Sequence, residues 1–425
     1  MYKIILFTFF NIIYLSNGQY FSKTNHFKEM KTVYAWDQLG YNFDGVKYKQ
    51  NSAHQRLIDV VYFEDDPDDK DMFFIQYNNV PVGFEVYNER VFVTVPRRRY
   101  GIASTLNVLE DQSGSKAPLL RPYPNTASVS SLVSVYRPRV DECDRLWVID
   151  TGLLELPDKS QRVQMKEPEI IIYNLKTNEE ILRHKIKSTS LVNGTTSGLT
   201  SITVDVTKTS CDDAYAYITD LATAGLIVFS LREKDTWRFS HNSLMFDDGA
   251  SDFKIGSRVI DWKDSLFSVA LTEPNSQGVR TAYYHPLVAT QEFSITTDVL
   301  KNKTADFDLN HKLEGVRGVW SQSGSHAYHP ETRTLLFANV AQDGVLCWNV
   351  DVRLTSKTTA LVAQHHKQLI YISDLKVVGD SVWVLANKMP HFIYAKLNTN
   401  ETNFNIMKGK IVDLIKNTTC EGKKQ

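Results

Sequence analysis

The sequence predicts an all-β fold, a six-bladed β-propeller of four-stranded antiparallel blades, from three observations. One unit recurs six times in the 425 residues: an apolar strand that ends in a polar residue, then a loop and a second apolar strand. A further β-rich strand precedes each copy, and helical periodicity is not sustained anywhere. Four strands per unit, repeated around a channel, leave only short edges exposed.

The six units account for most of the chain. Their second and third strands lie in RVFVTVPRRRYGIASTLNVL (90–109), RLWVIDTG with EIIIYNL (145–175), AYAYITDLATAGLIVFSL (214–231), TAYYHPLVATQEFSITTDVL (281–300), TLLFANVAQDGVLCWNV (334–350) and SVWVLANKMPHFIYAKL (381–397). The preceding strands read PVGFEV, SVYRPRV, TSITVDV, SLFSVAL, GSHAYH and ISDLKVV. We expect one propeller domain over 19–425 with blades over about 75–415, closed with the help of segment 33–43. The alternative, a two-domain β-sandwich, does not require six matching units.

The first residues have the pattern of a secretory signal peptide. Lys3 precedes an apolar run over 4–15, and small or turn-forming residues follow up to Gly18. The run has about twelve residues, whereas a membrane span needs roughly twenty. We therefore expect cleavage after residue 18 and a secreted, extracellular protein without a membrane anchor.

Composition narrows the class of partner. The chain has 48 Lys+Arg against 49 Asp+Glu, so no basic field is present to attract nucleic acid. Four acceptor motifs for N-linked glycan agree with the expectation that the protein is exported; they lie at Asn193, Asn302, Asn400 and Asn417. The acidic segment 62–74 lacks the ligand spacing and glycine turn of a calcium loop, and we interpret it as a solvated loop.

The cysteines predict disulfides and no metal site. In an oxidising compartment an even number of widely spaced cysteines predicts two bridges, with three pairings open: Cys143, Cys211, Cys347 and Cys420. No CxxC pair occurs, and the HHK segment at 365–367 has no partner at metal spacing. We expect neither a metal nor a cofactor.

Equivalent positions of the units separate core residues from candidate site residues. Trp147 aligns with a large apolar residue in every other unit, namely Phe92, Tyr217, Tyr283, Leu336 and Trp383, which predicts packing between blades. Three residues after this position come Asp150, Asp220 and Asn339, at strand ends. Such side chains either line the channel mouth or accept backbone N–H bonds in the turn that follows.

Five motifs in the same order resemble the yellow and major royal jelly protein family of insects. They are NVPVGFEVYNERVFVTVPRRRYGIASTLNVL, RVDECDRLWVIDTG, CDDAYAYITDLATAGLIVFSLREKDTWRFSH, GVLCWN and VWVLANKMPHF, within a similarity from about residue 33 to Cys420. The resemblance implies a secreted six-bladed propeller. It does not imply one function, because members include pigmentation proteins, dopachrome tautomerases, salivary amine binders and nutritive jelly proteins.

The resemblance also places ligand and disulfide residues. By comparison with amine-binding members, Ser373, Asn387 and Met389 fall on ligand-lining positions, with Met389 in place of an aromatic residue. Neighbouring Asp374 could neutralise an ammonium group. Because Cys143 and Cys211 precede matching strands of adjacent units, we expect them to pair, which leaves Cys347 for Cys420; the family pattern is similar.

Three hypotheses about function follow. The first is a secreted protein that binds a small aromatic amine, catechol or quinone through Ser373, Asn387, Met389 and Asn339 in pigmentation or developmental physiology. The second is a dopachrome tautomerase, an isomerase of melanin synthesis, with Asp150, Asp220 or Asp374 as acid or base. The third is a nutritive or structural protein of the royal jelly type. No GxSxG nucleophile motif is present.

Overall fold

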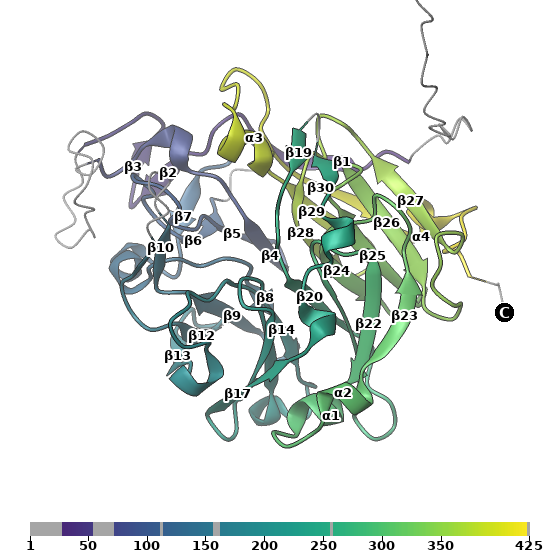
Figure 1. Cartoon of the computed structure of the whole chain (residues 1–425). Helices are drawn as coiled ribbons and strands as arrows, with labels where there is room; N and C mark the ends of the chain where they lie inside the picture. Colours follow the sequence, from purple (N-terminus) through teal and green to yellow (C-terminus); the bar gives the residue numbers. More distant parts are fainter. Residues whose placement is uncertain (1–27, 54–71, 111–113, 156–161, 256–257, 423–425) are drawn as a thin grey trace, which may run out of the picture.

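The computed structural model describes residues 28–53, 72–110, 114–155, 162–255 and 258–422. Six small antiparallel sheets stand in a ring around a channel (Figure 1), so the predicted six-bladed β-propeller is confirmed. The predicted signal peptide and most of the acidic segment 62–74 lie outside the described residues.

Each blade runs from an inner strand beside the channel to an outer strand. Blade 1 has β4 (Gly83–Tyr87), β5 (Arg90–Thr94), β6 (Leu106–Leu109) and β7 (Leu120–Pro122), extended by β2 (Tyr41–Phe43) and β3 (Val46–Tyr48). Blade 2 has β8 (Arg139–Val140), β9 (Arg145–Asp150), β12 (Glu169–Asn174) and β13 (Glu180–Lys185). Blade 3 has β14 (Leu199–Asp205), β15 (Tyr215–Asp220), β16 (Gly225–Ser230) and β17 (Asp235–Ser240).

Blades 4 to 6 follow the same order. Blade 4 has β20 (Leu266–Leu271), β21 (Thr281–Pro286), β22 (Gln291–Thr296) and β23 (Lys312–Val316). Blade 5 has β24 (Ser323–His329), β25 (Thr334–Asn339), β26 (Gly344–Asn349) and β27 (Thr359–Gln364). Blade 6 has β28 (Ile372–Val378), β29 (Ser381–Ala386), β30 (Phe404–Lys410) and β1 (Lys31–Trp36).

Elements outside the blades are short. Two hairpins join β10 (Leu153–Glu155) to β11 (Arg162–Gln164) and β18 (Phe253–Ile255) to β19 (Arg258–Ile260). The α-helices of the described chain are α1 (Thr297–Lys301), α2 (Phe307–Asn310), α3 (Met389–Tyr394) and α4 (Ile411–Ile415). No helix in these parts of the chain is long and apolar enough to cross a membrane.

The N-terminal segment over 33–43 contributes to two blades. It forms two strands in two blades, because β1 pairs with β30 of blade 6 whereas β2 pairs with β7 of blade 1. Gly40 lies at the break, where an added Cβ would come within 2.9 Å of both Leu119 and the Tyr48 carbonyl oxygen. The segment thus joins the last blade to the first, and blade 1 has six strands rather than four.

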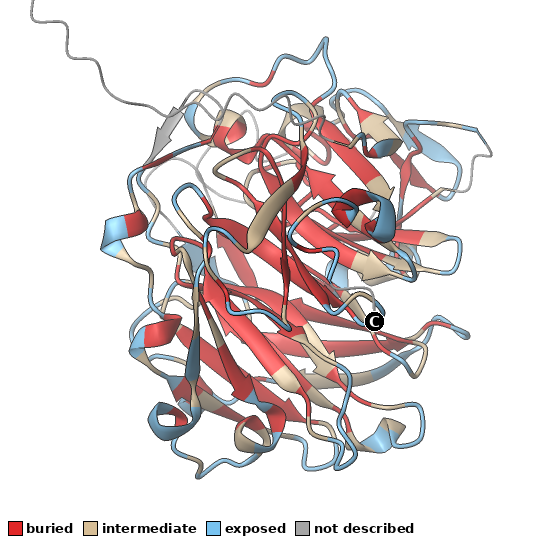
Figure 2. Cartoon of the chain, turned by 90° about the vertical axis from the view of Figure 1, so that its right-hand side faces the viewer, coloured by how far each residue is buried: buried red, intermediate tan, exposed pale blue. Residues whose placement is uncertain are grey.

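The apolar core lies between neighbouring blades. Trp147 is fully buried and packs against Phe229 of blade 3, as the repeated apolar position predicts. Phe92, Tyr217, Tyr283 and Leu336 are also buried, whereas Trp383 is only partly so. In Figure 2 the strands are mostly buried and the connecting loops carry most of the exposed residues.

Two disulfides confirm the expected pairing. Cys143 joins Cys211 between blades 2 and 3, and Cys347 joins Cys420, which ties the C-terminal segment to blade 5. No described cysteine is free.

Candidate functional site

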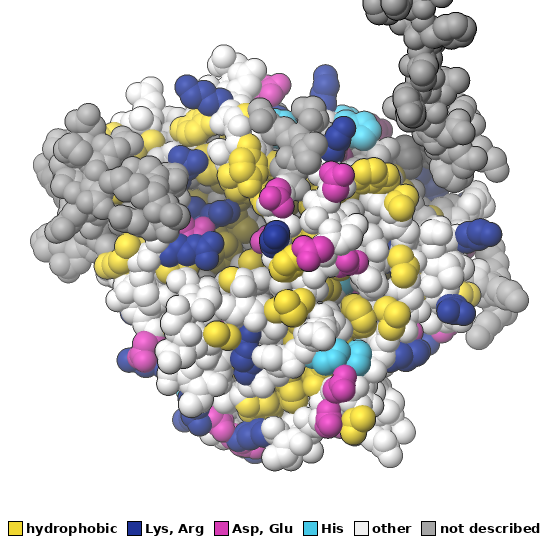
Figure 3. All heavy atoms as spheres, in the orientation of Figure 1, with side chains coloured by type: hydrophobic (Ala, Val, Ile, Leu, Met, Phe, Trp, Pro, Cys, Tyr) yellow, Lys and Arg dark blue, Asp and Glu magenta, His cyan; other side chains and the backbone are white. Residues whose placement is uncertain are grey.

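A cavity of about 130 Å³, lined by both polar and apolar side chains, opens where the inner strands begin. Residues next to the first residues of β4, β8, β14, β20 and β28 line it, so five blades contribute. The charged and aromatic lining residues are Arg98, Tyr136, Arg137, Glu155, Arg162, Asp264, Phe267 and Tyr371. We call this the mouth cavity. Figure 3 shows basic and acidic side chains close together near the middle of the face viewed.

Arg137 forms the floor of the mouth cavity. It precedes β8, which is short because Pro138 has no N–H to donate to a ladder. The Arg137 guanidinium donates to the Ser373 carbonyl oxygen at 2.7 Å and the Thr200 carbonyl oxygen at 3.2 Å. It also lies 4.3 Å from the centre of the Phe267 ring. Because Arg137 lines a second cavity as well, of about 150 Å³ deeper in the channel, it lies between the two.

Arg98 and Glu155 form an ion pair on the wall. Arg98 Nε lies 2.7 Å from Glu155 Oε2, and its Nη1 lies 3.6 Å from the Met389 sulfur. Tyr136 donates its hydroxyl to the other Glu155 oxygen at 3.2 Å. Burial would raise the pKa of Glu155, but Arg98 and Arg162 hold it below its usual value. Glu155 is therefore an ionised, fully engaged carboxylate.

Asp264 is the carboxylate of the mouth cavity that has no such partner. It lies two residues before β20, and its carbonyl oxygen accepts from the Val288 N–H at 3.1 Å, which fixes the backbone. Among the described residues its carboxyl group makes no hydrogen bond or ion pair. Burial raises the pKa of Asp264 to about 6, against the opposing effect of Arg98 and Arg137. A carboxyl group of this kind exchanges protons near neutral pH.

Tyr371 adds a phenol in a strained backbone. Its φ of +52° lies in the left-handed region, which a bulky residue rarely adopts. The Trp262 ring packs edge-on against its ring at 5.4 Å, and burial raises the pKa of Tyr371 to about 12. The phenol therefore stays protonated and is available as a hydrogen-bond donor.

The residues placed by family resemblance lie around this cavity in different roles. Met389 lines it directly. Asn387 is fully buried: its amide donates to the Pro81 carbonyl oxygen at 2.7 Å and accepts from the Met389 N–H at 3.0 Å. Ser373 donates its hydroxyl to the Leu385 carbonyl oxygen at 3.2 Å. In this geometry Asn387 positions Met389, and Ser373 positions Arg137.

Asp374 lies in the deeper cavity, beyond Arg137. Its oxygens accept from the Phe84 N–H at 3.1 Å, the Ser325 hydroxyl at 3.1 Å and the Leu375 N–H at 3.0 Å. Lys376 is 3.4 Å away. Asp374 thus joins the inner strands of blades 1, 5 and 6 and is separated from the mouth cavity.

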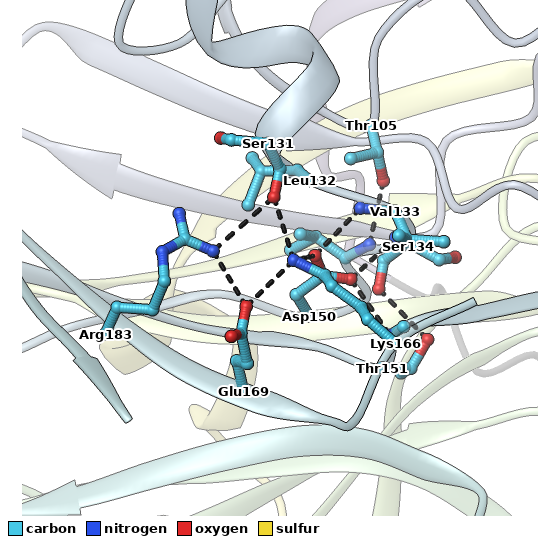
Figure 4. A network of polar contacts seen from close by, with 12 residues as sticks. Thr105, Ser131, Leu132, Val133, Ser134, Asp150, Thr151, Lys166, Glu169 and Arg183 are labelled. Carbon is cyan, nitrogen blue, oxygen red and sulfur yellow. Dashed lines mark hydrogen bonds and ion pairs between the residues drawn. The ribbon is translucent and has the colours of Figure 1, made fainter. Parts of the chain in front are cut away.

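Asp150 is completely buried in a network of polar contacts (Figure 4). Its two oxygens accept from the N–H groups of Val133 and Ser134, each at 2.8 Å, and of Gly152 at 3.0 Å. Lys166 adds an ion pair at 2.8 Å and continues the network to Glu169. This carboxylate holds the turn after β9.

Asp220 and Asn339 hold equivalent turns. Asp220 accepts from the Gly198 N–H at 2.8 Å and pairs with Arg238 at 3.0 Å. Asn339 accepts from the Gln342 N–H at 3.0 Å. Neither lines the mouth cavity.

Sequence reasoning missed the principal charges of the cavity. It searched the ends of the second strands, whereas Arg137, Asp264 and Tyr371 lie just before inner strands. Signals were present in YRPR and WKDSLF, where charged residues adjoin a strand that must line the channel. Arg98, in PRRRYG, instead follows β5, the second strand of blade 1.

The fold and this cavity define a class: a disulfide-linked six-bladed β-propeller with a charged, small-molecule-sized cavity at one channel mouth. The family model described as major royal jelly protein matches residues 133–420. The chain belongs to this family, which includes the yellow proteins.

Three curated relatives illustrate the match. "L-dopachrome tautomerase yellow-f" of Drosophila melanogaster is 36% identical over 408 residues, covering 92% of this chain and 94% of its own. "Dopaminechrome tautomerase" of the same species is 30% identical and covers 90% of this chain and 88% of its own. "Protein yellow" of Drosophila erecta is 32% identical, with 92% and 71% covered.

Proposed function

We propose that the protein is a tautomerase of aminochromes, acting on a dopachrome-like quinone in the mouth cavity. The observation that carries the proposal is Asp264, a carboxyl group with no hydrogen bond or ion pair among the described residues, whose pKa is raised to about 6 beside arginines and a tyrosine. Two relatives whose names specify aminochrome tautomerases support the same class of reaction.

The reaction requires a base and a group that stabilises oxygen. Asp264 as carboxylate takes a proton from a saturated ring carbon, and the electron pair moves through the ring to a quinone oxygen. That oxygen then gains a proton, so each C–H proton lost is matched by an O–H formed. Substrate and product are isomers, and the step needs no oxidant, reductant or cofactor.

The other cavity residues have separate roles in this proposal. Arg98 faces the weakly accepting Met389 sulfur, so its Nη1 can turn to a quinone oxygen, and the Tyr371 hydroxyl can donate to the same charge. Arg162 is exposed at the rim, and its guanidinium makes no hydrogen bond or ion pair to a described residue. It can pair with the carboxylate that L-dopachrome carries and dopaminechrome lacks. Phe267 and Met389 supply apolar walls.

We also propose that the protein acts outside the cell. Two disulfides suit an oxidising compartment, and all four predicted glycan acceptors, Asn193, Asn302, Asn400 and Asn417, are exposed.

The test is the decay of L-dopachrome with purified protein, followed by its visible absorbance and corrected for the spontaneous reaction. We expect saturable catalysis, and a loss of about 10²- to 10⁴-fold in kcat for Asp264→Asn. Asp261→Asn is the matched control, because Asp261 is an exposed carboxylate three residues away and does not line the cavity. Decay at the uncatalysed rate with wild-type protein contradicts the proposal.

A second candidate is binding of a small aromatic amine, catechol or quinone without turnover. The apolar walls of Phe267 and Met389 favour it, since they suit a flat ring. Calorimetry with dopamine, serotonin and catechol would then give heat at one site per chain while dopachrome decays at its spontaneous rate. Absence of both binding and turnover would favour the nutritive or structural role.

A further inference from the structure

Two histidines and an aspartate that do not line the mouth cavity meet at the surface. His241 follows β17 of blade 3, whereas Asp308 lies in α2 and His311 directly after it. One ligand atom from each lies within 4.8 Å of the others. Figure 3 shows histidine surface beside acidic surface in the region where Figure 1 places α2. We call these three residues the α2 cluster.

Local structure orients Asp308 and His311. The Asp306 side chain accepts from the N–H groups of Asp308 and Leu309, which fixes the start of α2. Residues three apart on a helical turn lie on the same side, as Asp308 and His311 do. His311 Nδ1 lies 3.0 Å from the Asp308 carbonyl oxygen. Because a carbonyl only accepts, Nδ1 carries the proton and the Nε2 lone pair of the neutral ring remains available.

His241 is held by a relay on its other side. The Ser243 N–H donates to His241 Nδ1 at 3.0 Å, and His241 Nε2 lies 2.9 Å from Asp308 Oδ1. Ser243 Oγ lies 2.8 Å from the same Nδ1 and 2.7 Å from the Tyr284 hydroxyl. If a cation replaces the proton on Nε2, Nδ1 takes up the proton, loses the hydrogen bond that it accepts from the Ser243 N–H, and donates instead to Ser243 Oγ, which can donate to the Tyr284 hydroxyl. Such support of the non-ligating nitrogen is usual at metal sites.

We propose that the α2 cluster binds one divalent transition-metal ion, with zinc as the representative. His241 Nε2, His311 Nε2 and an Asp308 carboxylate oxygen supply three ligands, a set that zinc accepts in four-coordinate sites whose last position is open to water. The site is near the surface, with His241 and His311 partly exposed and Asp308 exposed, so an ion can enter. Because His241 and Asp308 are 67 residues apart, sequence spacing does not reveal the site.

A second cluster of metal-ligating side chains is not proposed as a metal site. His285, Glu292 and His326 are buried together between blades 4 and 5. There the Arg317 guanidinium already pairs with Glu292, and both nitrogens of His285 are engaged, by Glu292 and the Gly324 carbonyl oxygen. A cation would meet a buried positive charge, so this group is a closed ion-pair network.

Titration calorimetry of the full secreted chain with zinc chloride tests the proposal. We expect one ion per chain, and a dissociation constant raised at least about tenfold by His311→Ala and by Asp308→Asn. His311→Ala is the principal variant because His241 also caps a turn, and the unfolding temperature without zinc checks that each variant is folded.

His366→Ala is the matched control. His366 is an exposed histidine paired with one carboxylate, Asp343 at 3.0 Å, and no third ligand lies near them within the described part of the chain. We expect this variant to bind zinc as the wild type does. Absence of zinc binding to the wild type, or wild-type affinity in both His311→Ala and Asp308→Asn, would overturn the proposal.

Discussion

Asp150 and Asp264 are two carboxylates near the same channel mouth, and they differ in what surrounds them. Asp150 accepts three backbone N–H bonds and pairs with Lys166. The Asp264 carboxyl group makes no hydrogen bond or ion pair among the described residues, and burial raises its pKa to about 6. The surroundings explain the difference between the two carboxylates, because a buried charge is stable where hydrogen-bond donors surround it and is disfavoured where they do not.

The contrast indicates where chemistry can occur in this propeller. A carboxylate whose lone pairs are all engaged has no capacity to take a proton from a substrate. Carboxylates at the ends of the second strands, such as Asp150, therefore hold turns, whereas Asp264, just before an inner strand, is the residue that we propose as the reactive group. Three variants probe these two positions and the rim of the cavity.

The largest expected effect on stability is at Asp150. Asp150→Ala leaves three buried N–H groups and the Lys166 ammonium without their acceptor, and we expect a loss of about 3–5 kcal/mol in the free energy of unfolding. Urea denaturation measures it. Turnover per folded molecule should remain close to that of the wild type. A stability loss below about 1 kcal/mol would show that the network in Figure 4 is not a structural one.

Asp264→Asn should instead increase the free energy of unfolding at neutral pH. The pKa is raised in the folded protein, so the folded state holds the proton between about pH 4 and pH 6 and stability falls as pH rises through that window. Removing the charge should therefore stabilise the protein at pH 7.5, by at most about 3 kcal/mol, and leave it unchanged at pH 4. Thermal unfolding at both pH values measures this. A variant less stable than wild type at pH 7.5 would show that the carboxylate has stabilising partners.

The smallest expected effect is at Arg162. Arg162→Gln should raise KM for L-dopachrome by about tenfold and leave KM for dopaminechrome unchanged, since only the former has a carboxylate to pair with. Arg121→Gln, an exposed arginine on β7 outside the cavity, is the control. Equal changes in KM for both substrates would show that Arg162 does not pair with the carboxylate of L-dopachrome.

Much of the fold could be predicted from the sequence because it repeats. The apolar position of Trp147 recurs in six units, and the matched strand positions also predict the Cys143–Cys211 pair. The split of segment 33–43 between two blades could not be predicted, because it depends on the close packing around Gly40.

The candidate site was less accessible to sequence reasoning. Resemblance predicts Met389 as a ligand-lining residue, and this stays a prediction; in the structure Met389 lines the mouth cavity. Asp264 was missed because the search for site residues was directed at strand ends, although WKDSLF places a carboxylate just before a channel-lining strand. Its pKa is raised by burial in the closed ring, against the lowering effect of Arg98 and Arg137, and the sequence shows neither the burial nor these neighbours.

The decisive measurement is the pH dependence of kcat/KM for L-dopachrome. If Asp264 is the base, activity should be low while it is protonated and rise to a plateau with a midpoint near pH 6, the value its burial sets. The residual activity of Asp264→Asn should lack this rise. A wild-type profile that is flat from pH 5 to 7, or a rise near pH 6 that persists in the variant, would show that Asp264 is not the base.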